Sequence, residues 1–268
     1  MKMKRSEKLG MFTGLVVGVL LLLISVFMIF QTTCKVWGAE KPANATQQGI
    51  DVSSHQGKID WEQVKNSALA DYAIIRCGYG VNQTDKDDKY WDYNSSECER
   101  LGIPYGTYLY SGADTTAKAK SEAEHVVRLL QGKNLTYPIY YDMEADMLNQ
   151  LSSTQIGNIA KTFLNTMESY GYKNVAVYSN KYLFETKLTA SVFSDYPKWI
   201  AQHSNKCTYQ GSYHMWQYST QGVIPGISEK VDLNYKIGNW TYAGYSSAKK
   251  TVVVKPKATT IKSLRKSG

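Results

Sequence analysis

Cysteine is scarce in this sequence, with four residues in a chain of 268: Cys34, Cys77, Cys98 and Cys207. No two of them have the spacing of a metal-binding pair, which argues against a metal centre built on thiolates. Cys77 stands in an apolar run, where a thiol behaves as a small hydrophobic side chain. A disulfide between Cys98 and Cys207 would suit an oxidising exterior, but the sequence does not establish one.

Acidic residues are missing from the end of the chain. The formal net charge is +8; residues 1–10 contribute +3 and residues 241–268, which contain no acid, contribute +7. The part in between is therefore slightly acidic, so the basic balance does not predict a nucleic-acid-binding core. The tail, residues 241–268, is interpreted as a flexible linker whose positive charge suits anionic wall polymers or lipid head groups.

Charged residues are also absent from residues 11–30. As a helix this segment would span about the 30 Å of a bilayer's hydrocarbon core. It is predicted to cross the cell membrane once, with the basic residues 1–10 in the cytoplasm and the rest of the chain extracellular. The alternative is a cleaved signal peptide and a secreted protein, but the poor cleavage site favours an anchor. Residues 31–48 are assigned to a linker.

Residues 49–240 are predicted to form one folded domain, and the 43% hydrophobic content of the chain excludes wholesale disorder. Strand-like runs alternate with helical patterns along it. The predicted strands are 49–54, 72–80, 103–111, 138–145, 174–180, 198–204, 214–220 and 230–235. Helical patterns start at Thr115 and at Ser152, and the second opens with a capping box and has Gly171 at its end.

This alternation predicts an α/β fold in which eight strands of a parallel sheet close into an irregular TIM-like barrel. The spacing leaves room for about five βα units, followed by three strands with little helix between them. In such barrels the chemistry gathers at the carboxyl ends of the strands. The residues that end each predicted strand are therefore the candidates for function.

Carboxylates stand at several of these strand ends. Asp142 and Glu144 are two positions apart in "PIYYDMEA", so in a strand they project from the same face. Two carboxylates that face one space raise the proton affinity of one member, which allows an acid beside an ionised neighbour. Asp51 ends the first strand and Asp232 stands on the eighth, and these strands are neighbours in a closed barrel. Asp146 is assigned to the loop that follows.

Aromatic residues close the same strands: Tyr79, Tyr110, Tyr178 and Trp216. A sugar ring can stack its C–H face on an aromatic ring while its hydroxyls bond to carboxylates. The combination predicts glycoside cleavage, which commonly needs one protonated and one ionised carboxyl. Each of the four aromatic residues has a competing interpretation as part of the barrel-rim core.

Five motifs carry a resemblance to a known family: "GIDVSSHQG", "YYDMEA", "WIAQ", "MWQYS" and "GISEKVDLN", in this order and spacing. Together they resemble glycoside hydrolase family 25, the Chalaropsis-type lysozymes or N-acetylmuramidases, over roughly residues 49–240. The resemblance implies an irregular barrel that cleaves the β-1,4 bond between N-acetylmuramic acid and N-acetylglucosamine in peptidoglycan glycan strands. No cofactor and no metal are expected.

Matched motif by motif, the resemblance implies Glu144 as the catalytic acid, Asp142 as its partner carboxylate, and Asp51 and Asp232 as further acids of the groove. The second step stays open. It uses either Asp142, as a nucleophile or ionic stabiliser, or the 2-acetamido oxygen of the substrate, and both routes retain the anomeric configuration. An inverting route would instead need a base that positions water.

Two other classes of function compete with this interpretation. One is a non-catalytic module that binds cell-wall glycan, which the intact pair of Asp142 and Glu144 argues against. The other is a metal-dependent carbohydrate deacetylase that uses Asp51 with His55. The chain has four histidines and no second pair of them at ligand spacing, which makes this the least favoured of the three.

Overall fold

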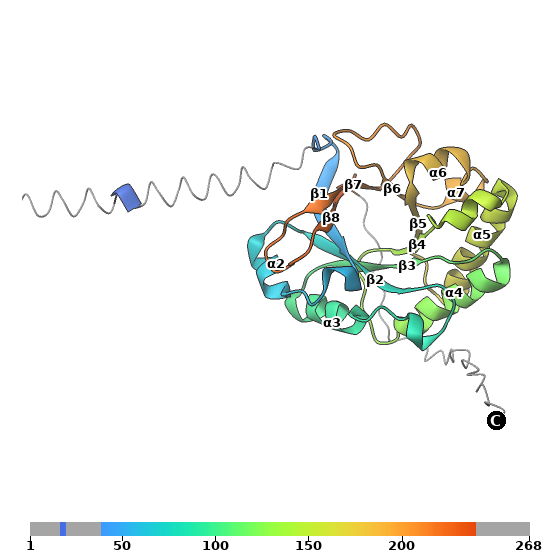
Figure 1. The fold of residues 1–268 in the computed structure, drawn as a ribbon, viewed down its shortest axis with the longest axis horizontal. Coiled ribbons are helices and arrows are strands. Elements are labelled where there is room, and N and C mark those ends of the chain that lie inside the picture. The colour runs from blue at the N-terminus through green and yellow to red at the C-terminus, as the bar shows by residue number, and fades with distance from the viewer. Residues whose placement is uncertain (1–16, 20–38, 240–268) are drawn as a thin grey trace, which may run out of the picture. The chain divides into compact units, whose positions relative to one another are not determined.

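The computed structural model describes residues 17–19 and 39–239 (Figure 1). The chain divides into two compact units, Met1–Gly38 and Ala39–Gly268, and of the first only a short helical segment, 17–19, is described. Most of the predicted membrane segment 11–30 and all of the tail 241–268 lie outside the described residues, so both assignments stay predictions. Within the described residues, no helix combines the length and the apolar character that crossing a membrane requires.

Eight strands close into a barrel in sequence order (Figure 1). They are β1 (Ala45–Val52), β2 (Tyr72–Tyr79), β3 (Tyr105–Tyr110), β4 (Ile139–Asp142), β5 (Val175–Asn180), β6 (Lys198–Ala201), β7 (Met215–Gly222) and β8 (Val231–Ile237). Strands β1 to β7 pair in parallel, whereas β8 runs antiparallel to both β7 and β1. The closed, irregular TIM-like barrel is confirmed.

The antiparallel direction of β8 corrects the expectation of a parallel sheet. Residues 223–230 connect β7 to β8, and a parallel connection would need a crossover of about a dozen residues or more. The short connection therefore forces the chain to turn back. The sheet is mixed, with seven parallel strands and one that runs the other way.

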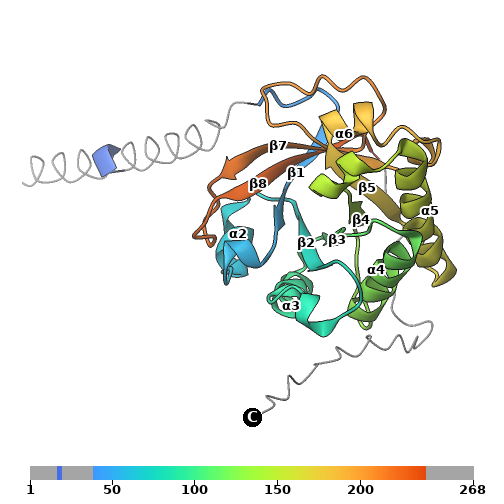
Figure 2. The same ribbon diagram turned by 45° about the vertical axis from the view of Figure 1, so that its right-hand side comes forward.

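Helices follow each of the first five strands. They are α2 (Trp61–Ser67), α3 (Trp91–Leu101), α4 (Thr116–Leu129), α5 (Ser153–Ser169) and, after β5, the short α6 (Lys181–Thr186) and α7 (Val192–Asp195). Three 3-10 turns add η1 (Ser54–Gln56), η2 (Thr84–Lys86) and η3 (Asp146–Gln150). In the described chain no helix lies between β6 and β8, so the predicted compression after five units is confirmed. Figure 2 shows α2 to α5 around the barrel and β7 and β8 completing its wall.

The ends of the predicted helices match their local sequence signals. The side chain of Thr115 accepts a hydrogen bond from the backbone N–H of Lys118 at the start of α4. Ser152 and Gln155 form the predicted capping box of α5. Gly171 follows Tyr170, the C-cap residue of this helix, and adopts a φ of 92°, a left-handed conformation that glycine adopts without strain.

Alternation along the strands divides the core into two clusters. Side chains that point outward pack under the helices, and those that point inward form a separate, mostly aromatic cluster. The inward cluster contains Tyr72, Ile74, Tyr137, Tyr140, Ala176, Tyr178, Trp199, Ala201 and Met215. The Tyr72 and Tyr137 rings stack with centroids 4.4 Å apart. A Cβ atom on Gly49 would lie 2.4 Å from the Tyr72 ring, so only glycine fits there.

The barrel begins earlier than residue 49, the predicted boundary. Strand β1 starts at Ala45, which pairs with Ile237 of β8, so the end of the segment assigned to the linker belongs to the barrel. Residues 45–48 are ATQQ, a sequence without apolar alternation. Their strand conformation comes from the ladder with β8, which the local sequence does not encode.

Candidate active site

The four predicted carboxylates lie at the end of the barrel formed by the carboxyl ends of β1 to β7, here named the carboxyl end. Asp142 is the last residue of β4, and Glu144 follows two positions later. Asp51, near the end of β1, lies directly opposite Asp232 in the β1–β8 pairing. Because β8 is antiparallel, its beginning lies at the carboxyl end. The reversed strand is therefore what brings Asp232 to the other three acids.

Burial and mutual repulsion raise the pKa values of these four carboxyls, and burial is the largest cause in each case. The charge of Asp232 further raises the pKa of Asp51, and the charges of Glu144 and Asp51 further raise that of Asp142. The pKa of Asp232 rises to about 6. The acids thus form one electrostatic group that keeps protons at pH values where isolated carboxyls are ionised.

Asp142 and Glu144 differ in exposure. Asp142 is only 3% exposed, and its Oδ1 atom has no hydrogen-bond partner among the described residues. A buried oxygen without a partner is costly and is typical of a functional position. Glu144 is partly exposed, and burial followed by the charge of Asp51 raises its pKa. Glu144 is therefore the member of the pair that a ligand can reach and that can carry a transferable proton.

Two buried amides, which the sequence interpretation missed, hold Asp51. Nδ2 of Asn234 donates to Oδ2 of Asp51 at 2.7 Å, and Nε2 of Gln217 donates to the same oxygen at 3.0 Å. Gln217 also donates to Oδ2 of Asp232 at 3.2 Å. Asn234 is fixed in turn by Nε1 of Trp199, which donates to its oxygen at 2.8 Å. The amides orient the acids of β1 and β8 without adding charge.

Three of the four predicted aromatic residues lie at the carboxyl end. Tyr110 is half-buried and opposite Asp142 in the β3–β4 pairing, and after burial the charges of Asp142 and Glu144 raise its pKa. Tyr79 ends β2 and is 43% exposed. Tyr178 is 7% exposed, and its hydroxyl donates to Oε1 of Gln217 at 3.0 Å, so it forms part of the buried polar network.

Trp216 is not brought to this site. Its side chain is fully buried, its Nε1 atom donates to the carbonyl oxygen of Gln202 at 2.9 Å, and its ring packs against Tyr218 and Tyr235. Neighbouring residues of a strand point to opposite faces, and Gln217 occupies the inward position. Trp216 therefore cannot stack on a sugar ring as predicted, because its side chain lies in the core. Met215 belongs to the inward cluster, and residues two positions apart in a strand share a face, so Gln217 rather than Trp216 points inward.

One cation, Arg76 of β2, also reaches this end of the barrel. Its Nε atom lies 2.8 Å from Oδ2 of Asp88, and its Nη2 atom donates to Oγ of Ser54 at 2.9 Å. The guanidinium counteracts part of the rise in the pKa of Asp142. Arg76 lies within the predicted strand 72–80 but was not among the candidate residues, although a charged residue in an otherwise apolar strand is a signal for function.

The structure also bears on the metal-dependent alternative and on the cysteines. His55 is an exposed residue of η1. Within the described ranges, no three His, Cys, Asp or Glu side chains form a group that could hold a metal ion. The pairing of Cys98 with Cys207, which the sequence left open, is not formed: Cys98 is a buried free thiol in α3, and Cys207 is a free thiol in the connection between β6 and β7.

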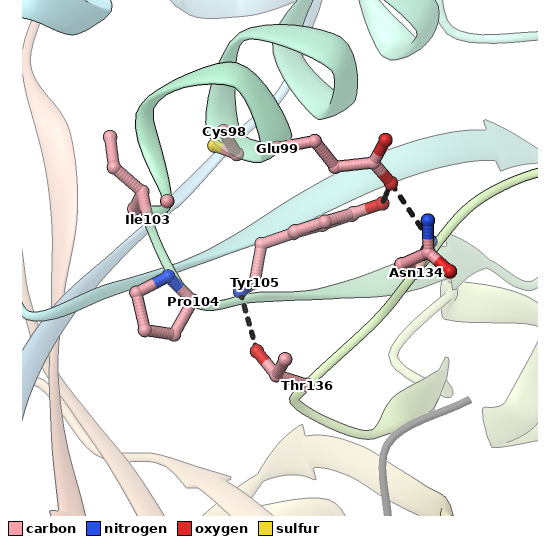
Figure 3. Close-up of a pocket in the computed structure, with 8 residues that line it drawn as sticks. Cys98, Glu99, Ile103, Pro104, Tyr105, Asn134 and Thr136 are labelled. Atoms are coloured by element: carbon pink, nitrogen blue, oxygen red, sulfur yellow. Dashed lines mark hydrogen bonds between the residues drawn. The ribbon is translucent and has the colours of Figure 1, made fainter. Parts of the chain in front are cut away.

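A cavity of about 320 Å³ lies at the start of β3, away from the carboxyl end. It is lined by Cys98, Glu99, Gly102, Ile103, Pro104, Tyr105, Asn134 and Thr136. Figure 3 shows the Tyr105 hydroxyl directed at Glu99, which also accepts a hydrogen bond from the backbone N–H of Asn134 at 2.8 Å. These polar groups pair with one another, and none of the four acids lines the cavity. It is therefore not part of the candidate active site.

The model of glycosyl hydrolases family 25 matches residues 50–227 of the sequence. This chain belongs to glycosyl hydrolases family 25. The matched segment includes Asp51, Asp142 and Glu144, while Asp232 lies just beyond it. The family expected from the motifs is confirmed.

Two curated proteins resemble the chain over about 70% of its length. The chain is 30% identical over 188 residues to the autolytic lysozyme of Clostridium acetobutylicum, a match that covers 70% of this chain and 55% of that protein. It is 27% identical over 199 residues to the uncharacterized protein YegX of Escherichia coli, covering 72% and 70% of the two chains.

Solved structures share the barrel. The modular autolysin LytC of Streptococcus pneumoniae is 33% identical with a TM-score of 0.65, over 70% of this chain and 46% of that one. The match thus spans less than half of LytC. A second LytC structure, with a TM-score of 0.64, is a complex with a synthetic peptidoglycan ligand.

Proposed function

We propose that this member of family 25 is a lysozyme that hydrolyses the β-1,4 bond between N-acetylmuramic acid and N-acetylglucosamine in peptidoglycan. The observation that carries the proposal is the group of four carboxyls at the carboxyl end, with pKa values raised by burial and by one another. Glycosidases need a carboxyl that stays protonated beside others that can ionise. The relatives that are lysozymes and autolysins add support.

In this proposal Glu144 protonates the leaving oxygen, because it combines a raised pKa with partial exposure. Asp142, which has one buried oxygen without a hydrogen-bond partner among the described residues, stabilises the positive charge that develops on the sugar or orients the 2-acetamido group that attacks it. Both versions retain the anomeric configuration. Asp51 and Asp232 position the substrate and tune the charge around Glu144.

The decisive experiment replaces Glu144 by glutamine and follows the release of reducing ends from purified peptidoglycan. Glu144→Gln keeps the volume but removes the proton, so turnover should fall by on the order of 10²–10⁴-fold. The matched control is Glu122→Gln. Glu122 is a buried carboxyl of α4 that bonds Ser111, Tyr141 and the backbone of Gly112, outside the four-acid group.

The control variant should keep its turnover even where it loses stability. Near-normal turnover in Glu144→Gln would end the assignment of the acid. Glycan binding without any release of reducing ends by the wild-type protein would point to the wall-binding module instead.

A further inference from the structure

A bulge interrupts β2 just before the carboxyl end of this strand. The β2–β3 register steps from Arg76 to Gly78 on β2 while β3 advances by a single residue, so Cys77 is an extra residue. Side chains point alternately to the two faces of a strand, so one extra residue reverses the face that each later side chain occupies. Bulges that re-aim a side chain in this way are common at the rims of barrels and beside active sites. The residue re-aimed here is Tyr79, the last residue of β2.

The neighbours of Tyr79 show which way its side chain points. Gly78 faces outward, because a Cβ atom added to it would lie 2.9 Å from Cε1 of His125, a residue of α4 outside the barrel. The next residue, Tyr79, therefore faces inward. It pairs with Tyr110, which shares a face of β3 with Tyr108, and Tyr108 packs against the inward cluster. The exposed side chain of Tyr79 thus points into the mouth of the barrel beside Tyr110.

A polar cluster between α4 and the segment after η2 lies behind Tyr79. It is here named the Asp87 cluster and consists of Asp87, His125 and Arg128. Nδ1 of His125 lies 3.0 Å from the carbonyl oxygen of Gly80, and its Nε2 lies 2.7 Å from Oδ1 of Asp87. Nη1 of Arg128 donates to Oδ2 of Asp87 at 3.0 Å. The cluster therefore links α4 to the backbone that follows Tyr79.

The Asp87 cluster fixes the backbone on both sides of Tyr79. Before Tyr79, Gly78 forms an isolated antiparallel bridge with Asp87. After Tyr79, the carbonyl oxygen of Gly80 contacts the histidine of the cluster, and the N–H of Gly80 donates to the carbonyl oxygen of Tyr110 at 2.9 Å. Gly80 has a φ of 61°, in the left-handed region that favours glycine. The direction of the Tyr79 side chain thus depends on contacts that come from outside the barrel.

We propose that Tyr79 and Tyr110 form a platform for one pyranose ring of a glycan strand, and that the Asp87 cluster is a set of positioning residues which keeps Tyr79 turned into the barrel mouth. The inference rests on the proposed function. Tyr79 pairs with Tyr110, and Tyr110 pairs with Asp142. Neighbouring strands lie about 4.8 Å apart, so the backbone of Tyr79 is about 10 Å from that of Asp142. The platform therefore takes a sugar other than the one that reacts at the acids.

The chemistry of the Asp87 cluster fits a positioning role better than a stabilising one. The side chain of His125 is fully buried, and those of Asp87 and Arg128 are mostly buried. Buried ionic groups lose hydration and give little net stability over apolar packing, whereas they can fix a single conformation. A ring that is already held in its binding orientation loses less conformational freedom when a sugar stacks on it, which favours affinity.

The test measures binding of soluble peptidoglycan oligosaccharides, from the disaccharide to the octasaccharide, by calorimetry in a Glu144→Gln background that separates binding from turnover. Tyr79→Ala should weaken binding on the order of tenfold, and only for the longer oligosaccharides that reach the platform. Tyr79→Phe keeps the ring and loses only a long hydrogen bond to the carbonyl oxygen of Asp85, so it should bind normally. His125→Leu should weaken binding of the same long oligosaccharides, but less than Tyr79→Ala does.

A double variant of Tyr79→Ala and His125→Leu separates a positioning role from a general effect on the fold. If the cluster acts through Tyr79, the double variant should bind the oligosaccharides like Tyr79→Ala alone. The control is Asn94→Leu, which removes a buried amide that bonds Trp61 outside the barrel and should lower stability alone. Should His125→Leu fail to fold, Arg128→Met, which keeps the histidine in place, substitutes for it with the same expected direction.

Three results would overturn the proposal. Unchanged affinity of Tyr79→Ala for every oligosaccharide would remove the platform. A loss of stability in His125→Leu without a loss of affinity, or an effect of His125→Leu that persists in the Tyr79→Ala background, would show the Asp87 cluster to be merely structural. Failure of the proposed function gives a different result: wild-type protein that releases no reducing ends from peptidoglycan would end the lysozyme assignment, while the expected pattern of binding would still support the platform.

Discussion

The inside of the barrel has two halves with opposite chemistry. The half near the amino ends of the strands is filled by rings such as Tyr72, Tyr140 and Trp199, all at most 1% exposed. The half at the carboxyl end holds Asp51, Asp142 and their amide partners. Both halves use the same inward positions of the same strands. The difference shows that position along a strand, rather than the choice of strand, separates residues that fill the barrel from residues that perform chemistry.

The largest expected effect breaks the aromatic half. Tyr72 is fully buried and stacked on Tyr137, so Tyr72→Ala should cost about 3–5 kcal/mol of unfolding free energy, measured by denaturant unfolding. The turnover of the molecules that stay folded should not change. The matched control, Tyr72→Phe, removes only a hydroxyl that has no partner among the described residues and should be nearly neutral. A loss of turnover in the folded molecules of either variant would show that the aromatic half also contributes to the chemistry.

A somewhat smaller effect is expected in the acidic half, and on rate rather than on stability. Asp142→Asn should lower turnover by about 10²–10³-fold, since it removes charge stabilisation next to the reacting sugar. Its unfolding free energy should be unchanged or higher, because burial and neighbouring acids disfavour a charge at this position. Parallel measurement of turnover and denaturant unfolding checks this. A strongly destabilised variant would show Asp142 to be a structural residue.

The smallest effect concerns pH. Burial raises the pKa of Asp232 to about 6 in the folded protein, against an ordinary value of 3.8. The folded state therefore binds the proton of Asp232 more tightly than the unfolded state does. The stability gained from this proton is complete below pH 3.8 and is lost as the pH rises through about 6. Across this window, the stability of wild type relative to Asp232→Asn should fall by roughly 2–3 kcal/mol. A difference that does not depend on pH would show that Asp232 is not protonated on folding.

Much of this division was predictable from local patterns. The strand runs predicted the barrel, and the acids that close them predicted the meeting of Asp51, Asp142, Glu144 and Asp232. The meeting of Asp51 with Asp232 was predicted for strands that run in parallel. It occurs although β8 runs the other way, because Asp232 stands near the beginning of that strand.

The remaining residues of the site could not be predicted from the sequence, for physical reasons. Trp216 and Gln217 are neighbours, and only the direction of each side chain decides which one enters the barrel. His203, whose Nε2 atom bonds Oε1 of Gln217 at 3.0 Å, lies beyond the end of β6, where the alternation of a strand no longer applies. Gln217 and Asn234 are uncharged, and their importance comes from partners that are far away in sequence, Asp51 above all.

Closure of the barrel by β8 has a consequence for biosynthesis. The β1–β8 ladder joins Asp51 to Asp232, so the last strand to be synthesised completes a site that the first strand begins. Contacts between segments so distant in sequence form late, because a long loop must close first. A nascent chain that ends before β8 carries Asp51, Asp142 and Glu144 but lacks Asp232 and Asn234. The order of synthesis thus delays assembly of the acidic group until the whole domain has been made.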